Sequence, residues 1–146
     1  MLKDFDKWNN KKKEIDFAVK STPFHEREVW WCTMGVNVGF EEDGKHENFE
    51  RPVLILKKFN KHVAWAVPLT TQSHNDIFHY QLKSSKTFVI LSQLRLISSK
   101  RLVRLVEKIN EDEILHIFEL LKGFLTLKSV SVKSDSRPFG AGSPLA

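Results

Sequence analysis

The sequence predicts a mainly β protein of the α+β class, with one core and a helix near each end. Two apolar runs, residues 53–56 and 62–69, are rich in β-branched and large aliphatic residues and flank a polar turn at Asn60, which is typical of a β-hairpin. Apolar residues also recur every three or four positions within residues 2–19 and 114–124, which is typical of amphipathic helices. A chain of 146 residues suits one domain.

Composition narrows the class of protein. Hydrophobic residues make up 41% of the chain and charged residues 28%, which indicates a globular protein and excludes a disordered or fibrous one. The net charge of +5 favours an anionic partner such as nucleic acid. Cys32 is the only cysteine, so we expect no disulfide framework and a reducing, cytoplasmic compartment. We expect neither export nor membrane insertion, because no apolar run suits a signal peptide or a membrane span.

The N-terminal segment has the spacing of a short amphipathic helix. The apolar residues on its expected inner side are Leu2, Phe5, Trp8, Ile15 and Val19. Pro23 ends this helix, since proline breaks the hydrogen-bond pattern of a helix interior. We therefore predict an amphipathic helical extension at residues 1–22 and a main domain at residues 23–127.

The pattern of the main domain predicts several short strands followed by a helix. The expected strands are residues 29–34, 53–56, 62–69, 78–82, 87–91, 94–97 and 102–109. Asn110 with Glu113 three residues later predicts a capping box for a helix that begins at Glu111. The apolar stripe of that helix is expected to pack on the sheet or on a second subunit. Residues 128–146 are small, polar and rich in Pro and Gly, and we expect a disordered tail.

A loop of about fifteen residues, 35–49, joins the first two strands, and loops of this length are often functional. It carries Glu41, Glu42 and Asp43, which would repel RNA unless they lie away from the phosphate path. The other interpretation is a solvated acidic loop.

Arg51 and Thr70 are the strongest candidates for a site. They flank the two hairpin strands, and antiparallel pairing would bring them to the same open end. Pro52 holds Arg51 extended and cannot donate a ladder hydrogen bond, which loosens the strand edge there. A guanidinium and a hydroxyl that face one spot suit the oxygens of a phosphate.

Several motifs occur in a fixed order between residues 28 and 97: VWW, GVNVGFEEDGK, RPVLIL, VPLTTQ and LSQLRLI. This ordered set resembles the MazF/PemK family of toxin endoribonucleases and is more specific than any one motif. The similarity continues into the helix after Asn110, so it covers about a hundred residues. One departure is Phe40, which follows the second glycine of the loop, where the family usually has a small polar residue.

The resemblance implies an SH3-like small β-barrel of the MazF/PemK/CcdB type that forms a homodimer. It implies the toxin of a type II toxin-antitoxin system: a metal-independent, sequence-selective endoribonuclease for single-stranded mRNA, with Arg51 and Thr70 as the catalytic pair. A MazE-like cognate antitoxin with an acidic, disordered segment is the implied partner. The family usually starts at the first strand, so residues 1–22 are an addition. We expect them to form a docked or frayed lid, with contact to RNA or antitoxin as the alternative.

RNA can be cleaved without a metal because its 2′-hydroxyl attacks the adjacent phosphorus and leaves a 2′,3′-cyclic phosphate. The protein must move protons and stabilise charge on the phosphoryl oxygens. Arg51 suits the second task, and Thr70 can add a neutral hydrogen bond. The proton carriers stay open, because a guanidinium rarely gives up its proton.

The further candidates for RNA binding are Thr71, Gln72, His74, Tyr80, Gln93 and Arg95. His74 is close enough to the TTQ turn to act as an acid or base, although exposed loop histidines are common. Tyr80 alternates with apolar neighbours and is the favoured residue for base stacking. Gln93 and Arg95 either contact RNA or lie on the solvent-exposed face of a strand.

We predict no metal or cofactor. There is no HExxH pattern, and His25, His46, His62, His79 and His116 have no second ligand at metal spacing.

Two alternatives stay open. Arg51 could instead form a surface salt bridge with Glu50 or with a loop carboxylate. The chain could also be a non-enzymatic barrel that binds RNA without cutting it, or that inhibits DNA gyrase by protein contact. Arg51 and Thr70 favour the enzyme, because a pure binder does not need both.

Overall fold

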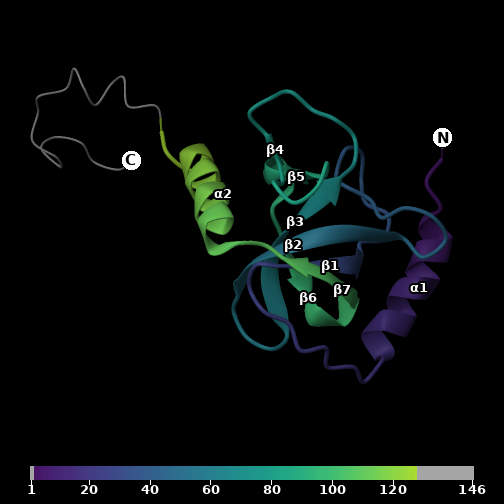
Figure 1. The fold of residues 1–146 in the computed structure, drawn as a ribbon. Helices are drawn as coiled ribbons and strands as arrows, with labels where there is room; N and C mark the ends of the chain where they lie inside the picture. Colours follow the sequence, from purple (N-terminus) through teal and green to yellow (C-terminus); the bar gives the residue numbers. More distant parts are fainter. Residues whose placement is uncertain (1, 128–146) are drawn as a thin grey trace, which may run out of the picture.

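The computed structural model describes residues 2–127, whose strands form one antiparallel sheet in the order β4-β5-β3-β2-β1-β7, with β6 paired to β3 (Figure 1). The strands are β1 (Glu28–Thr33), β2 (Glu50–Lys58), β3 (Val63–Thr70), β4 (His79–Gln81), β5 (Phe88–Ile90), β6 (Arg95–Ser98) and β7 (Leu102–Lys108). The helices are α1 (Phe5–Phe17) and α2 (Glu111–Phe124), with short 3₁₀ turns η1 (Leu91–Gln93) and η2 (Ser99–Arg101). The expected tail, residues 128–146, lies outside the described residues.

The β2–β3 hairpin is the centre of the sheet. β2 pairs with β1 and β3, while β3 also pairs with β5 and β6. These pairings confirm the mainly antiparallel β fold with a helix near each end. Among the described residues, β4 and β7 are the two ends of the pairing order, so the closed SH3-like barrel stays a prediction.

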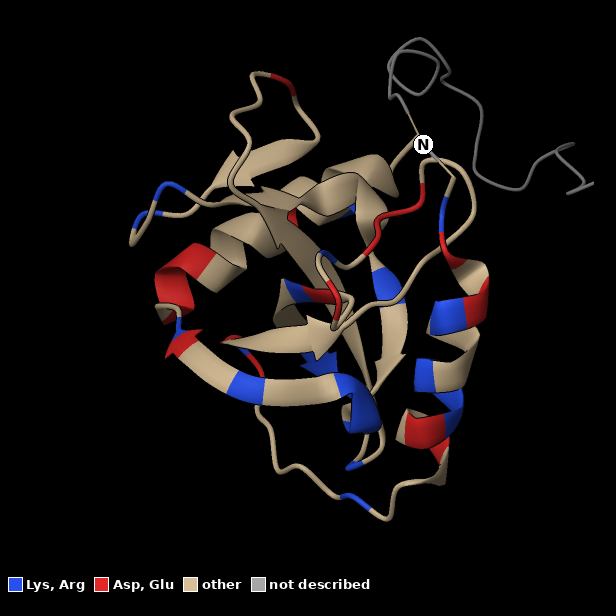
Figure 2. Ribbon diagram, turned by 90° about the vertical axis from the view of Figure 1, so that its right-hand side faces the viewer, with Lys and Arg blue, Asp and Glu red and all other residues tan. Residues whose placement is uncertain are grey.

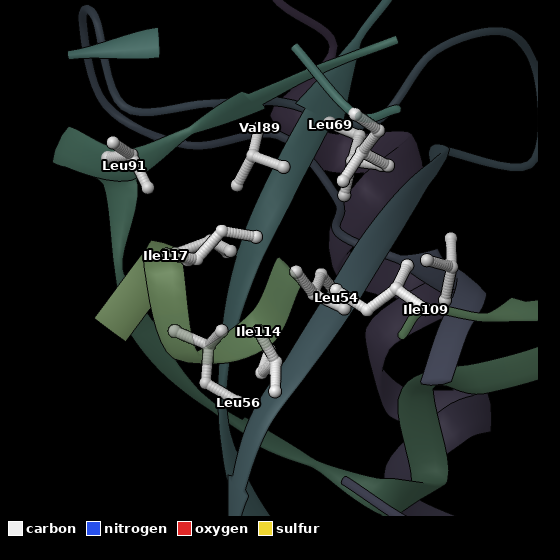
Figure 3. Close-up of a cluster of buried hydrophobic side chains, with 11 residues drawn as sticks. Leu54, Leu56, Leu69, Val89, Leu91, Ile109, Ile114 and Ile117 are labelled. Atoms are coloured by element: carbon white, nitrogen blue, oxygen red, sulfur yellow. The ribbon is translucent and has the colours of Figure 1, made fainter. Parts of the chain in front are cut away.

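Two hydrophobic clusters lie on opposite faces of the hairpin. The cluster between the sheet and α2 includes Leu54, Leu56, Leu69, Val89, Ile114 and Ile117 (Figure 3). The second cluster includes Phe24, Trp30, Cys32, Met34, Val53 and Ile55. The split follows from the two-residue period of a strand, because Leu54 and Ile55 must point to opposite faces. Full burial of Ile114 or Ile117 stabilises the fold by about 1.5 to 3 kcal/mol, which fixes the first turns of α2 on the sheet.

The start of α2 differs from the predicted capping box. The helix begins at Glu111 as predicted, but the side chain of Asn110 makes no capping hydrogen bond. The buried carboxylate of Glu113 instead accepts hydrogen bonds from the hydroxyl of Tyr80 (3.0 Å) and the backbone N–H of Lys83 (2.8 Å). Glu113 therefore bonds to partners distant in the sequence instead of to the first turn of its own helix.

The N-terminal helix is present, although its predicted apolar side is mostly exposed. Trp8 is buried, whereas Leu2, Phe5, Phe17 and Val19 are exposed. Both signs of charge lie along the helix (Figure 2). The helix ends at Phe17, well before Pro23, so proline does not end it. One aromatic side chain and polar contacts, rather than an apolar stripe, dock α1 on the domain.

Within residues 2–127, no helix combines the length and the apolar character that a membrane crossing requires.

Candidate active site

The open end of the β2–β3 hairpin borders a hollow of about 470 Å³. Arg51, near the start of β2, and Thr70, at the end of β3, both line it, together with Thr71. The Nη1 of Arg51 donates a hydrogen bond of 3.0 Å to the carbonyl of Leu69, which ties the two strand ends together. The structure confirms that Arg51 and Thr70 lie at the same open end of the hairpin.

The guanidinium of Arg51 is buried, and each of its nitrogens has an oxygen partner. Besides the bond from Nη1, Nε donates to the carbonyl of Asp43 (2.6 Å), and Nη2 lies 2.7 Å from a carboxylate oxygen of Glu42. Arg51 is only 6% exposed, so its cation does not project into solvent. The salt bridge to a loop carboxylate, left open by the sequence, is present, but Arg51 is buried rather than at the surface.

The hydroxyl of Thr70 faces the same region. Its Oγ1 accepts a hydrogen bond of 3.2 Å from the backbone N–H of Gln72, a contact that leaves the hydroxyl proton free to be donated. Thr70 is buried, and because it is the last residue of β3, the strand fixes its backbone position. Thr71 and Gln72 are exposed in the turn that follows.

The loop of residues 35–49, here called the acidic loop, folds back on the site. The N–H of Gly44 donates to the carbonyl of Gly35 (2.8 Å), and a Cβ on Gly44 would lie 1.7 Å from the carbonyl oxygen of Phe49. Gln93 holds the loop from η1: its Nε2 donates to the carbonyl of Phe40 (3.0 Å), and its Oε1 accepts from the N–H of Glu42 (3.2 Å). Both ends of the Gln93 amide are thus used within the protein.

Of the six predicted RNA-binding residues, Thr71 lines the hollow, whereas Gln72, His74, Tyr80, Gln93 and Arg95 do not. Arg95 is half-buried on β6, opposite Ala66 of β3. Tyr80 packs with its ring centroid 5.3 Å from that of His116. Burial, together with the hydrogen bond to Glu113, raises the pKa of Tyr80 to about 12. The structure therefore gives Tyr80 a packing role, and its contact with RNA stays a prediction.

A histidine pair joins the turn after β3 to the start of β4. The rings of His74 and His79 stack in parallel, 3.8 Å apart at 3°, and Nδ1 of His79 lies 2.7 Å from a carboxylate oxygen of Asp76. The hydrogen bond from His79 lowers the pKa of Asp76. The ligand atoms of these three residues lie within 4.8 Å of one another, so the statement that His79 has no second ligand at metal spacing is wrong. A metal lies in the plane of each imidazole that binds it, so the stack must open before both rings could hold one ion.

Trp31 also lines the hollow, together with Lys45 and His46, which the sequence did not assign to the site. His46 is the only imidazole among the described residues that line it. Its backbone φ of +63° belongs to the turn that closes the acidic loop. The sequence carried no signal for this placement, because the return path of a long loop is set by distant contacts.

Fold and site together define an antiparallel β protein with a buried arginine and a threonine hydroxyl in one hollow. Residues 25–125 match the family described as "PemK-like, MazF-like toxin of type II toxin-antitoxin system". The match covers more than half of the chain, so the protein belongs to this family. Residues 1–24 lie outside the match.

Solved structures share the fold at low sequence identity. MazF (Form-I) from Deinococcus radiodurans is 18% identical, with a TM-score of 0.63, over 73% of this chain and 99% of that one. A mycobacterial endoribonuclease, solved with its cognate antitoxin, is 15% identical, with a TM-score of 0.54, over 71% of this chain and 95% of that one. The Mycobacterium tuberculosis toxin MazF-mt6 is 14% identical, with a TM-score of 0.52, over 68% and 96%. No curated protein sequence matches the chain.

Proposed function

We propose that the protein is a toxin that cleaves single-stranded RNA at selected sequences without a metal ion. Its family membership supports the toxin class. The observation that carries the proposal is that Arg51 and Thr70 line one hollow at the open end of the hairpin. A cation with a fork of donors and a neutral hydroxyl are the groups that a phosphodiester needs there.

In the proposed reaction, the 2′-hydroxyl of the RNA attacks the adjacent phosphorus, and the 5′-oxygen of the next nucleotide leaves. Arg51 stabilises the charge that builds on the phosphoryl oxygens, and Thr70 donates a hydrogen bond to one of them. A guanidinium keeps its proton, so another group must move protons. We assign this to His46, which lines the same hollow: its neutral imidazole accepts the proton of the 2′-hydroxyl and then gives it to the leaving 5′-oxygen.

The walls of the hollow suit a single strand. Trp31 offers an aromatic surface for an unpaired base, with the guanidinium of Arg104 lying 4.8 Å from its ring centroid. Lys45 and Thr71 offer contacts for the neighbouring phosphates. The net charge of +5 would draw RNA to the protein in a salt-dependent way.

One observation favours the non-enzymatic alternative. Arg51 is 6% exposed and paired with Glu42, an arrangement that suits a structural ion pair as well as a closed active site. A barrel that binds RNA or a protein such as gyrase would have no need to free this arginine.

A homodimer and a cognate antitoxin are the proposed partners. The mycobacterial endoribonuclease of similar fold is described with its cognate antitoxin, which supports an antitoxin here. Trp65 and Leu96 are cross-strand neighbours on β3 and β6 and are 46% and 54% exposed, which supports a buried contact with a second copy. Sedimentation at micromolar concentration tests the dimer, and a monomer would contradict it.

The reaction is tested by incubating the purified protein with a long unstructured RNA in EDTA and analysing the product ends. We expect cleavage with a 2′,3′-cyclic phosphate on the upstream product, and resistance where the cut site carries a single deoxyribose. Metal-dependent cleavage to 5′-phosphate ends would show that water attacks instead. Binding without any product would favour the non-enzymatic alternative.

A further inference from the structure

We propose that the N-terminal segment controls access to Arg51 by clamping the acidic loop closed, with Lys3 and Trp8 as positioning residues. This inference rests on the proposed function, in which the phosphate of RNA must reach Arg51. Lys3 and Trp8 both lie before residue 25, where the family match begins. The clamp is therefore an addition of this chain to the shared fold.

Lys3 is fully engaged with the acidic loop. Its ammonium group donates hydrogen bonds to the carbonyls of Asn37 (2.7 Å) and Gly39 (2.8 Å), and it lies 2.9 Å from a carboxylate oxygen of Asp43. A lysine ammonium has three donors, so these contacts use its whole capacity. The segment before α1 thus holds the two sides of the loop together.

Trp8 holds the base of the same loop. A Cβ on Gly35 would lie 2.1 Å from the Trp8 ring, so the loop begins in direct contact with the indole. Phe49, at the other end of the loop, has its ring centroid 5.5 Å from that of Trp8. Figure 1 shows α1 beside the sheet, with the loop between β1 and β2 reaching its N-terminal end. Both ends of the loop are therefore packed on one buried residue of α1.

Asp43 links the clamp to the site. Its side chain contacts Lys3, while its backbone carbonyl accepts a hydrogen bond of 2.6 Å from Nε of Arg51. The next residue back, Glu42, places a carboxylate 2.7 Å from Nη2 of Arg51. A movement of the loop away from Lys3 would withdraw both partners from the guanidinium.

The carboxylate of Glu42 stands where one oxygen of a phosphate would bind Arg51. A phosphate and a carboxylate present similar planar pairs of acceptors to a guanidinium, so they compete for the same donors. RNA can bind Arg51 only after Glu42 leaves, and the apparent affinity for RNA falls by the fraction of protein with an open loop. Contacts that favour the closed loop therefore weaken RNA binding.

The clamp and simple electrostatics predict opposite changes in RNA affinity when Lys3 is removed. Removing a lysine should weaken RNA binding, because a positive charge is lost. Lys3→Ala should instead tighten it by about three- to tenfold, because more of the protein has an open loop. Lys13→Ala is the matched control: it removes the same charge from exposed α1, and the structure gives Lys13 no contact with the acidic loop.

The test measures binding of a fluorescent, mixed-sequence 2′-O-methyl oligonucleotide, which lacks the attacking hydroxyl. A second readout, without oligonucleotide, is amide hydrogen exchange in residues 35–49. We expect Lys3→Ala to bind more tightly than Lys13→Ala and to exchange faster in the loop. Equal or weaker binding by Lys3→Ala, or unchanged exchange, would overturn the clamp. If no protein binds the oligonucleotide, the proposed function fails, and the exchange measurement alone decides whether Lys3 holds the loop.

Discussion

The carboxylate of Glu42 lies 2.7 Å from Nη2 of Arg51, which lines the same hollow as Thr70. Arg51 is therefore neutralised by its own chain in this structure. A buried cation that loses its partner is strongly destabilised, so Glu42 must be replaced by another anion when it moves. The phosphodiester of a bound RNA would supply that replacement.

The first prediction concerns Glu42→Gln. The amide keeps the shape but removes the competing charge, so RNA at low concentration should be cleaved several-fold faster. Stability should fall by about 1 to 3 kcal/mol, because buried Arg51 loses a charged partner. Initial rates and urea unfolding measure the two effects. Cleavage as slow as that of Arg51→Ala would show that Glu42 takes part in the reaction.

The second prediction concerns Gly35→Ala. A Cβ there would meet Trp8 at 2.1 Å, and φ is +81°, so we expect a loss of about 2 to 4 kcal/mol and release of α1. Gly39→Ala is the matched control, since Gly39 also has a positive φ (+57°) but its Cβ would meet nothing within 4 Å. Proteolysis of α1 and urea unfolding report the difference. Equal losses in the two variants would mean that backbone strain, rather than Trp8, limits this position.

The third prediction uses Tyr80, the single tyrosine of the chain. Burial and the hydrogen bond to Glu113 raise its pKa from 10.0 to about 12, so the native protein should form little phenolate at about pH 10.5. Absorbance of the phenolate measures this directly, with urea-unfolded protein as the control. If Tyr80 of the native protein were half-ionised near the ordinary pKa of a tyrosine, its buried contact with Glu113 would be contradicted.

The fourth prediction concerns acid stability. Burial alone would raise the pKa of Glu28, but hydrogen bonds from the backbone N–H of His25 (2.8 Å) and the indole of Trp30 (2.7 Å) hold it below the ordinary value of 4.5. A lowered folded pKa contributes stability above the unfolded pKa, and this contribution is lost as the pH falls through the folded pKa. Glu28→Gln should therefore lower stability by about 1 to 3 kcal/mol at about pH 7, and by less at about pH 3. Urea unfolding at both pH values measures it, and an equal loss at each would contradict the charged role of Glu28.

Much of the fold follows from local patterns. Alternating apolar residues predict the strands, and a short turn at Asn60 forces antiparallel pairing, which brings Arg51 and Thr70 together. Cys32 is a free, buried thiol, as its position in an apolar run predicts.

The features that escaped prediction depend on contacts between distant residues. Glu113 has the spacing of a capping box, but the Tyr80 hydroxyl and the Lys83 N–H compete successfully for its carboxylate. Gln93 lies in an alternating pattern that is typical of a solvent-exposed strand residue. Its side-chain amide nevertheless makes hydrogen bonds to the acidic loop, more than fifty positions away. The contact of Lys3 with Asp43 joins two segments whose approach no local pattern encodes.

The most direct test of the proposed function is the single-turnover cleavage rate of Arg51→Ala. If Arg51 stabilises charge in the transition state, its loss should raise the barrier by about 3 to 4 kcal/mol, a rate decrease of a few hundred-fold or more. Arg51→Lys should recover little, because an ammonium lacks the fork of donors, and Thr70→Ala should lose less, because its hydrogen bond is neutral. Circular dichroism shows that each variant is folded. A folded Arg51→Ala protein that cuts RNA at the wild-type rate would contradict the account.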